Sequence, residues 1–404
     1  MSIAVPASPH TELSRGFVLI MSLACGLCAG ANYFNQPLIY AIATDLHTTT
    51  TQAALTVVLA QVGYGLGLLF LVPLGDLLEK RRFIISLMIL SATAQILLSF
   101  SDSLALLYSM TLGASFFSIA AQVLIPFAAT LSPSHKSAEI VGVLMSGLVM
   151  GILLARTFAG FISTTLSWHY VYLLSGIFTL MFAVVMWHKL PTTQPNRELK
   201  LLGIYRSLIE LAYQQPHLIR RGIAGGLGFG ILAMIFTTMT FILANPPYLF
   251  NEFQIGLFGL LGVIGIFATR WSGKTIGQGK ENFVAILCSS LLLLGWIPLA
   301  FARMNLGLYA LGVLMCYFGL TAFHVLNQNL VYRISIHARS RINAVYMTLY
   351  FSGAALGSLC TVYAWAHWSW PGCVLFGIMY GSLILAIDRY DFRQMRQADS
   401  SSVS

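Results

Sequence analysis

Residues 53–82 read AALTVVLAQVGYGLGLLFLVPLGDLLEKRR. About twenty consecutive, mostly apolar residues can cross the hydrocarbon core of a bilayer as a helix, and this run ends in a short loop with three successive basic residues. The same alternation of apolar runs and polar breaks continues on both sides. It predicts helices over 17–43, 53–73, 83–100, 104–131, 139–165, 170–188, 222–244, 254–271, 282–301, 306–331, 342–365 and 373–388. The expected fold class is an all-α membrane protein with twelve transmembrane helices.

The composition supports this reading and excludes several classes. Of the 404 residues, 57% are hydrophobic and only 9% are charged, against about 25% charged residues in soluble domains. An ordinary soluble enzyme, a disulfide scaffold and a disordered chain are therefore excluded. The six cysteines all lie in apolar runs, where they are expected to be packing residues, and neither a metal site nor a cofactor is predicted.

The net charge of +9 is interpreted as a topological signal rather than a nucleic-acid surface. Excess Lys and Arg mark the cytoplasmic loops of membrane proteins. With the N-terminus inside, every Lys and Arg falls in a cytoplasmic segment except Arg303, which is outside, and Arg156, which is within the membrane. Both termini of this multi-pass protein are therefore expected in the cytoplasm.

A polar segment at 189–221 divides the chain into an N-terminal half (1–188) and a C-terminal half (222–404). In this linker Ile204, Leu208 and Leu211 share one helical face, which predicts a short amphipathic helix on the membrane surface.

An internal repeat supports the division into two six-helix halves. A shift of 202 residues places Gly151 on Gly353 and Trp168 on Trp370. Parallel six-helix halves related by an axis along the membrane normal form one known transporter architecture.

The loop after the second predicted helix carries a family resemblance. Leu74, Asp76, Lys80 and Arg81 match the cytoplasmic loop motif of the major facilitator superfamily, Gly-x-Leu-x-Asp-Arg-x-Gly-Arg-Arg. The stretches 31–37 and 341–346 look most like the bacterial branch of twelve-helix drug:proton antiporters. The resemblance implies the major facilitator fold, the bacterial inner membrane, and a latch between the halves that involves Asp76, Lys80 and Arg81. A merely topological role for this basic loop is the alternative.

In the superfamily, helices 1, 4, 7 and 10 line a central cavity, and each carries a polar stripe here. The i, i+3, i+4 or i+7 spacings put the members of each stripe on one helical face. Hydrogen bonding between helices is the alternative for any single stripe. The candidate substrate-binding residues on these helices are Asn32, Asn35, Gln36, Gln122, Thr237, His324, Asn327 and Gln328.

Two candidates are ionisable. No carboxylate is expected in mid-membrane, so His324 is the main candidate for proton coupling, because imidazole can change charge near neutral pH. Arg156 is expected in the outer half of the membrane. A charge there requires an aqueous cavity, a substrate or a structural hydrogen-bond partner.

These features predict a secondary active transporter that works by alternating access. Its expected partners are a small-molecule substrate, protons as a coupling ion, and the lipid bilayer, with no nucleic acid and with a monomeric state. Export of a small, partly apolar organic compound is the favoured direction. Uptake of a small anionic metabolite is the alternative. A membrane-embedded enzyme or a non-transporting sensor is disfavoured.

Overall fold

The computed structural model describes residues 14–194, 201–335 and 339–402. All regular secondary structure within these ranges is helical, as expected from the apolar runs. The first half contains α1 (Arg15–Gly30), η1 (Ala31–Tyr33), α2 (Asn35–Asp45), α3 (Thr50–Phe70), η2 (Val72–Asp76), α4 (Lys80–Leu98), α5 (Leu104–Phe117), α6 (Ala120–Leu131), α7 (Ser134–Thr165) and α8 (Trp168–Lys189).

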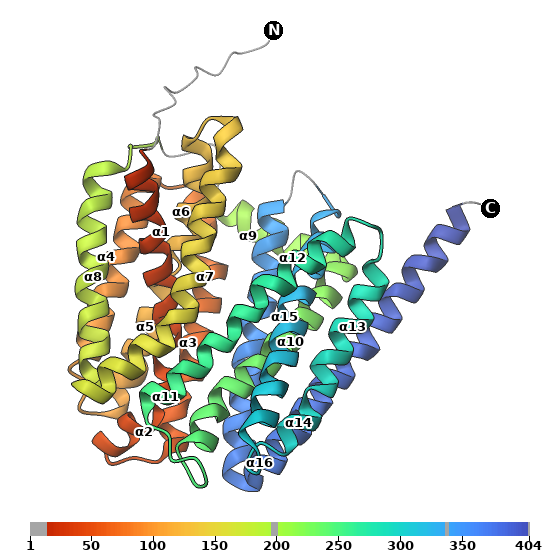
Figure 1. The fold of residues 1–404 in the computed structure, drawn as a ribbon. Helices are drawn as coiled ribbons and strands as arrows, with labels where there is room; N and C mark the ends of the chain where they lie inside the picture. Colours follow the sequence, from red (N-terminus) through yellow and green to blue (C-terminus); the bar gives the residue numbers. More distant parts are fainter. Residues whose placement is uncertain (1–13, 195–200, 336–338, 403–404) are drawn as a thin grey trace.

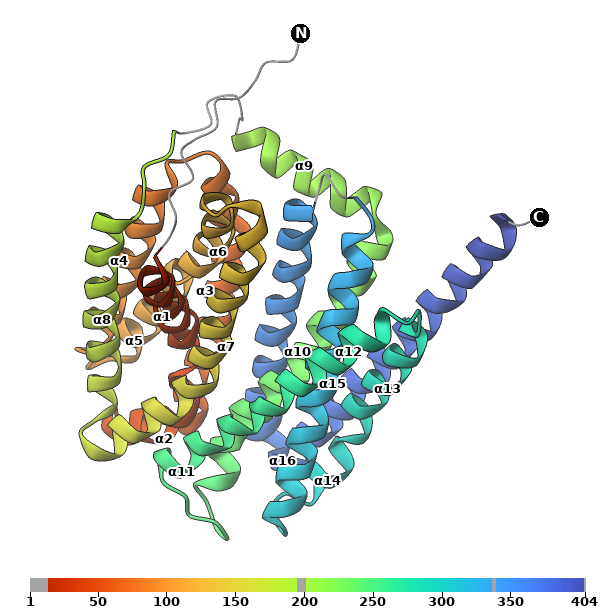
Figure 2. The same ribbon diagram turned by 45° about the horizontal axis from the view of Figure 1, so that its top comes forward.

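The second half follows a connecting helix, α9 (Leu201–Gln214), which lies in the segment expected to hold an amphipathic helix. It contains α10 (Pro216–Leu243), α11 (Glu252–Leu257), η3 (Phe258–Val263), α12 (Ile264–Ile276), α13 (Glu281–Leu294), α14 (Trp296–Ala300), α15 (Leu306–Tyr332) and α16 (Arg339–Ser402). Figures 1 and 2 show the two halves as two bundles beside each other.

Eleven segments within the described ranges are long and apolar enough to span a bilayer, and the last of them contains two crossings. That segment, Arg341–Gln394, has 54 residues and would be about 81 Å long as one straight helix, against a hydrocarbon core of about 30 Å. Ser369, with φ 52° and ψ −146°, interrupts it. The chain turns back there, so α16 forms the predicted eleventh and twelfth helices (Figure 1).

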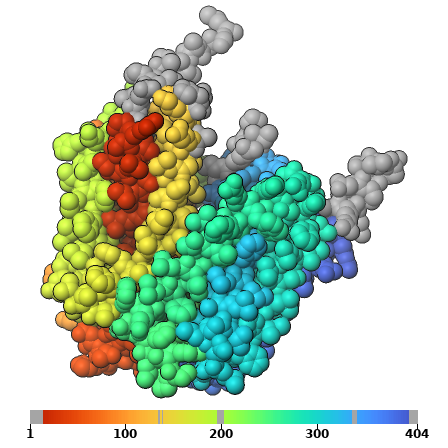
Figure 3. All heavy atoms as spheres, viewed as in Figure 1, coloured from red at the N-terminus to blue at the C-terminus, as the bar shows by residue number. Residues whose placement is uncertain are grey.

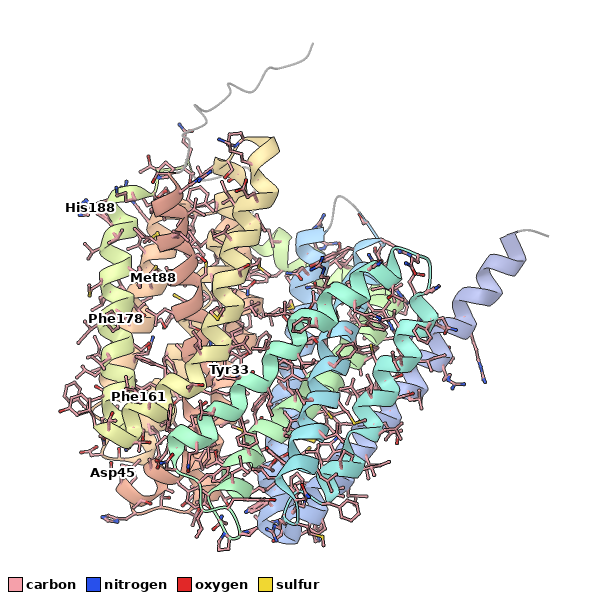
Figure 4. The ribbon with its side chains drawn as sticks, in the orientation of Figure 1. Tyr33, Asp45, Met88, Phe161, Phe178 and His188 are labelled. Atoms are coloured by element: carbon pink, nitrogen blue, oxygen red, sulfur yellow. The ribbon has the colours of Figure 1, made fainter. Side chains whose placement is uncertain are left out.

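Helix α1 begins and α16 ends on the same side of the molecule, which we call the terminal face (Figure 1). In Figure 4, His188 lies near this face, Asp45 lies toward the other side, and Tyr33 lies at mid-height near the boundary of the two bundles. We call the side near Asp45 the opposite face.

Close glycine contacts join equivalent helices in both halves. A Cβ on Gly30 of α1 would lie 2.9 Å from the Gly151 carbonyl oxygen of α7, and one on Gly230 of α10 would lie 2.8 Å from the Gly353 carbonyl oxygen of α16. The pairs Gly26–Gly151 and Gly226–Gly353 are equivalent contacts. They show that α1 and α10 are related by a shift of 200 residues, whereas α7 and α16 keep the shift of 202.

The two halves are joined toward the opposite face. Thr240 Oγ1 donates to the Gln36 carbonyl oxygen at 2.6 Å, Thr157 Oγ1 donates to the Gly256 carbonyl oxygen at 3.0 Å, and Asn245 bonds to the Tyr40 hydroxyl. At the terminal face the bundles part between α7 and α12, as the space-filling view shows (Figure 3). The structure is therefore closed at the opposite face.

Candidate functional site

Arg156 lies on α7 where the two halves meet, and its side chain is buried. Its Nε donates to Gln36 Oε1 at 2.5 Å, and Nη1 donates to the Ile152 carbonyl oxygen at 3.3 Å. The guanidinium carbon lies 4.0 Å from the centre of the Phe236 ring of α10 and 4.7 Å from that of Tyr33. The partners therefore come from both halves.

The charge of Arg156 is balanced by dipoles and ring faces. None of the ion pairs found within the described ranges includes Arg156. A guanidinium group is stabilised less by aromatic faces and carbonyl oxygens than by a carboxylate partner. The two hydrogen bonds use two of its five N–H donors. The other N–H donors would be available to an oxygen ligand that reaches this side chain.

Aromatic rings bridge the halves beside this arginine. Tyr64 of α3 packs on Phe351 of α16, with ring centroids 4.6 Å apart. Phe351 meets Phe229 of α10 edge to face at 5.2 Å, and Phe229 stacks on Tyr350 at 4.4 Å. Because all four rings are nearly fully buried, we call them the aromatic bridge: Tyr64, Phe229, Tyr350 and Phe351.

Polar candidates lie at both ends of the aromatic bridge. Gln122 of α6 donates to the Tyr64 hydroxyl at 3.1 Å. His324 of α15 lies 4.6 Å from the Tyr350 ring, and its Nδ1 is 3.1 Å from the Tyr346 hydroxyl. Both polar side chains are half-buried. The structure thus brings Gln36, Gln122, Arg156 and His324 to the region between the halves.

Asn32 and Asn35 lie elsewhere. Asn32 Nδ2 donates to Ser118 Oγ at 2.8 Å, and both asparagines line a small pocket inside the first bundle together with Gln95 and Thr111. Their helical face is turned toward α4 and α5 of the same half, so the structure does not bring these two residues together with the candidates between the halves, and their part in substrate binding stays a prediction. The shift of 200 between α1 and α10 relates Asn35 to Ile235.

Besides His324, three candidates lie on the second half. Thr237 is fully buried, and its hydroxyl lies 3.2 Å from that of Ser358, so it joins α10 to α16. Asn327 is also fully buried, and its Oδ1 accepts from Arg221 Nη1 at 3.2 Å. Gln328 is half-buried on α15.

A buried ion network in the second half was not predicted from the sequence. Arg221, at the start of α10, is bonded to Asp388 and Asp391 of α16, and all three side chains are buried. The charge distribution in the sequence places Arg221 in a cytoplasmic segment, and no carboxylate is expected in mid-membrane. The spacing of three residues between Asp388 and Asp391, which places both on one helical face, was the signal available.

Comparison with known proteins identifies the family. Residues 21–358 match the family described as "Major Facilitator Superfamily". The chain belongs to the major facilitator superfamily.

Relatives in the superfamily match almost end to end. The chain is 37% identical to an uncharacterised transporter, YgaY, of Escherichia coli O157:H7, over 91% of this chain and 94% of the relative. It is 27% identical to a transporter, SCO4007, of Streptomyces coelicolor, over 91% and 86%. The crystal structure of a bacterial homologue of the human lysosomal transporter Spinster superposes with a TM-score of 0.73, at 13% identity and over 96% and 98% of the two chains. The chain is thus a membrane transporter of the superfamily.

The superfamily loop motif lies between α3 and α4 at the terminal face. Lys80 Nζ lies 5.6 Å from the centre of the Phe127 ring, and the Arg81 guanidinium lies 4.6 Å from that of Trp187. Both aromatic partners belong to the first half. The side chain of Asp76 lies outside the described part of the structure. A latch between halves therefore stays a prediction for the conformation closed at the terminal face.

Glu79 fixes the start of α4 in the same loop. Its carboxylate accepts the backbone N–H groups of Arg81 and Arg82 at 2.9 and 2.8 Å, and that of Thr193 at 3.0 Å. Partial burial raises the pKa of this carboxyl, but the hydrogen bonds from Thr193, Arg82 and Arg81 together lower it more, so the pKa of Glu79 lies below its ordinary value. Glu79 therefore caps the helix and ties it to the residues before α9.

Proposed function

We propose that this transporter moves small organic compounds with an apolar or aromatic body by alternating access, and that export is its direction. The observation that carries the proposal is the aromatic bridge between the halves. Aromatic faces offer large apolar contact areas and orient flat ligands by stacking. Tyr64 belongs to the first half and its ring neighbour Phe351 to the second, so a compound bound between them would contact both halves.

The proposed orientation places the terminal face in the cytoplasm of a bacterial inner membrane. The excess of Lys and Arg in the loops on this side supports it, and the relatives cited above are bacterial. The conformation is then closed toward the outside. Asp76, Lys80 and Arg81 would hold the cytoplasmic side closed in the reverse conformation, and a monomer would suffice for the cycle.

We further propose that protons drive export by exchange, as the resemblance to drug:proton antiporters implies. The contacts of His324 with Tyr350 of the aromatic bridge and with a second tyrosine, Tyr346, support a part for His324 in this exchange, at the edge of the proposed site. A change in its charge would alter the polarity at the edge of the proposed site.

Proteoliposome flux tests this proposal directly. Aromatic probes of one size but different charge (benzoate, benzamide and benzylamine, and their naphthalene analogues) are offered with and without an imposed pH gradient. We expect saturable flux of the larger aromatic probes that responds to the gradient. Phe351→Ala should abolish saturation, whereas Phe100→Ala, an exposed phenylalanine at the opposite face, should not. Equal flux with protein-free liposomes, or equal effects of both variants, would contradict the proposal.

Uptake of a small organic anion is the second candidate. It is favoured by one observation: Arg156 is buried between the halves and its contacts are a glutamine, a carbonyl and two rings. Net inward flux of benzoate without flux of benzamide would favour it over export.

A further inference from the structure

The ion network joins the beginning of α10 to the end of α16 near the terminal face. Arg221 Nε donates to Asp391 Oδ2 at 2.8 Å, and its Nη2 is bonded to Asp388. Arg220 Nε donates to Asp391 Oδ1 at 2.5 Å, and His217 Nδ1 lies 3.4 Å from Asp391 Oδ2. The two carboxylate side chains are only 1% exposed. Two arginines thus face two aspartates in a buried site.

One carboxylate oxygen in this network lacks a hydrogen-bond donor. Asp388 Oδ2 is buried and has no hydrogen-bond partner among the residues that the structure describes. Ser289 of α13 lies beside this carboxylate, but its hydroxyl donates to the Ala285 carbonyl oxygen at 2.7 Å. An ionised carboxylate that leaves one buried oxygen unsatisfied is unfavourable. Adding a proton to that oxygen removes the buried charge, and the new O–H group can donate to the Ser289 hydroxyl oxygen beside it. Admitting a water molecule would also satisfy the oxygen.

Further polar contacts extend from the ion network toward the aromatic bridge. Arg221 Nη1 donates to Asn327 Oδ1 at 3.2 Å. The Asn327 Nδ2 is buried without an acceptor in hydrogen-bonding geometry, and the Tyr346 hydroxyl lies beside this side chain. Tyr346 in turn contacts His324 at 3.1 Å. A row of polar groups therefore leads from Asp388 to the edge of the aromatic bridge.

The network is also connected toward the surface. The side chains of His217 and Arg220, which both contact Asp391, are 26% and 33% exposed. Protons in the aqueous phase at the terminal face can thus reach residues that contact one carboxylate of the pair directly. The row of polar groups spans the distance between that phase and the aromatic bridge.

The first half fills the place equivalent to Arg221 and Asp388 without charges. The shifts of 200 and 202 residues relate Arg221 to Met21 of α1 and Asp388 to Met186 of α8. Both methionines are fully buried. Apolar packing therefore fills the equivalent place in the first half, and a buried ion pair exchanged for apolar side chains is often no less stable. The charges in the second half need a reason other than folding.

We infer that Asp388 binds and releases the coupling proton at the aqueous end of this row, and that His324, at its other end, passes the resulting change to the aromatic bridge. This rests on the proton exchange proposed above. When the carboxylate takes up a proton it becomes a neutral acid, and Arg221 keeps only Asp391 as an ionised partner. The charged and titratable groups that face the site are His217, Arg220 and Arg221 from α10, Cys288 from α13, and Asp391 from α16. A weaker hold of Arg221 on α16 would loosen α10 from its neighbour, and α10 also carries the bridge residue Phe229.

Proton binding can be measured without any substrate. Infrared difference spectra of the purified protein between about pH 8 and about pH 5 report the C=O band of a buried protonated carboxyl. We expect the band in the unmodified protein and in Glu281→Gln, which removes a carboxylate paired with Arg333 outside the network. The band should be missing from Asp388→Asn. Persistence of the band in Asp388→Asn would overturn the inference.

A double variant separates coupling from folding. Arg221→Met with Asp388→Met copies the first half and leaves Asp391 paired with Arg220. In proteoliposomes with the naphthalene probes, it should exchange substrate but lose accumulation driven by a pH gradient. Full recovery of gradient-driven accumulation would show a structural role and overturn the inference. Unmodified protein that transports the probes but ignores the gradient would instead refute proton exchange, and the infrared band would still decide whether Asp388 binds a proton.

Discussion

Replacing Arg156 tests whether the site between the two halves distinguishes substrates by their charge. Arg156→Lys keeps the positive charge but removes the planar fork and its stacking on Phe236 and Tyr33. Loss of one charged hydrogen bond to a carboxylate costs about 1.5–3 kcal/mol. The dissociation constant of an aromatic carboxylate should therefore rise by about 10- to 150-fold. Arg156→Gln removes the charge as well and should weaken binding further.

The same substitutions have a separate cost for the fold. Gln36 Oε1 accepts from Arg156 at 2.5 Å in a buried site, and leaving it without a donor costs about 1–3 kcal/mol of stability. Lower thermal stability is therefore expected in both variants, whatever the substrate is. The affinity of the folded protein for the substrate distinguishes a role of Arg156 in substrate binding from a purely structural role.

The assay is calorimetric titration with 2-naphthoate, 2-naphthamide and 2-naphthylmethylamine, normalised to folded protein from gel filtration. Arg303→Gln, which removes an exposed positive charge at the opposite face, is the matched control for net charge. We expect Arg156→Gln to weaken only the carboxylate and to leave the amide unchanged. Equal losses for carboxylate and amide, or unchanged affinity for both, would refute a charge-reading role for Arg156.

Three further predictions concern the loop between α3 and α4 and the closure at the opposite face. Glu79→Gln should lower the free energy of unfolding by about 0.5–2 kcal/mol near pH 7. The pKa of Glu79 is lower in the folded protein than in the unfolded chain, so the ionised carboxylate stabilises the fold above the unfolded pKa and loses this effect as the pH falls through the folded pKa. The difference in stability between the variant and the unmodified protein should therefore vanish in thermal melts at low pH. A difference that stays constant with pH would contradict the capping role of Glu79. Gly256→Ala should disfavour closure at the opposite face, since its Cβ would lie 2.5 Å from the Arg156 carbonyl oxygen, and unchanged labelling of cysteines placed inside would refute this. Asp76→Asn should slow transport without reducing expression, and an unchanged flux rate would leave the loop with a topological role only.

The positions of the transmembrane helices could be predicted closely because a span in a bilayer leaves little freedom. Its backbone must be hydrogen-bonded internally and its length must match the hydrocarbon core. The predicted break between 365 and 373 contains Ser369, where α16 turns back. The predicted linker at 189–221 includes the first residues of α10, which begins at Pro216. The division of the chain into two halves at this linker stays a prediction.

The neighbours of each polar face were harder to predict. A stripe at i, i+3 and i+4 fixes which residues share a helical face, but the partner of that face is a property of the packed bundle. Asn32 and Asn35 therefore turned toward their own half, whereas Gln36, one residue further, reaches Arg156. The ion pair of Arg221 with Asp391 joins residues 170 positions apart, and nothing local in either helix specifies that pairing.

The two halves share their glycine contacts but differ in where they bury charge. Arg156 corresponds to Ser358 in the second half, and Arg221 corresponds to Met21 in the first, so neither charge has a counterpart. Because burying a charge in a membrane protein is costly, the common scaffold explains neither position.

If Arg156 binds the substrate and Asp388 binds the proton, the two ligands bind to different halves. Their binding would then be coupled through the aromatic bridge that joins the halves. Tyr350 lies between His324 and Phe229. Replacing its ring in Tyr350→Ala should leave the affinity for naphthoate at Arg156 and the infrared band of Asp388 intact. The same variant should lose the dependence of flux on the pH gradient. Retained coupling in this variant would mean that the halves communicate by another route.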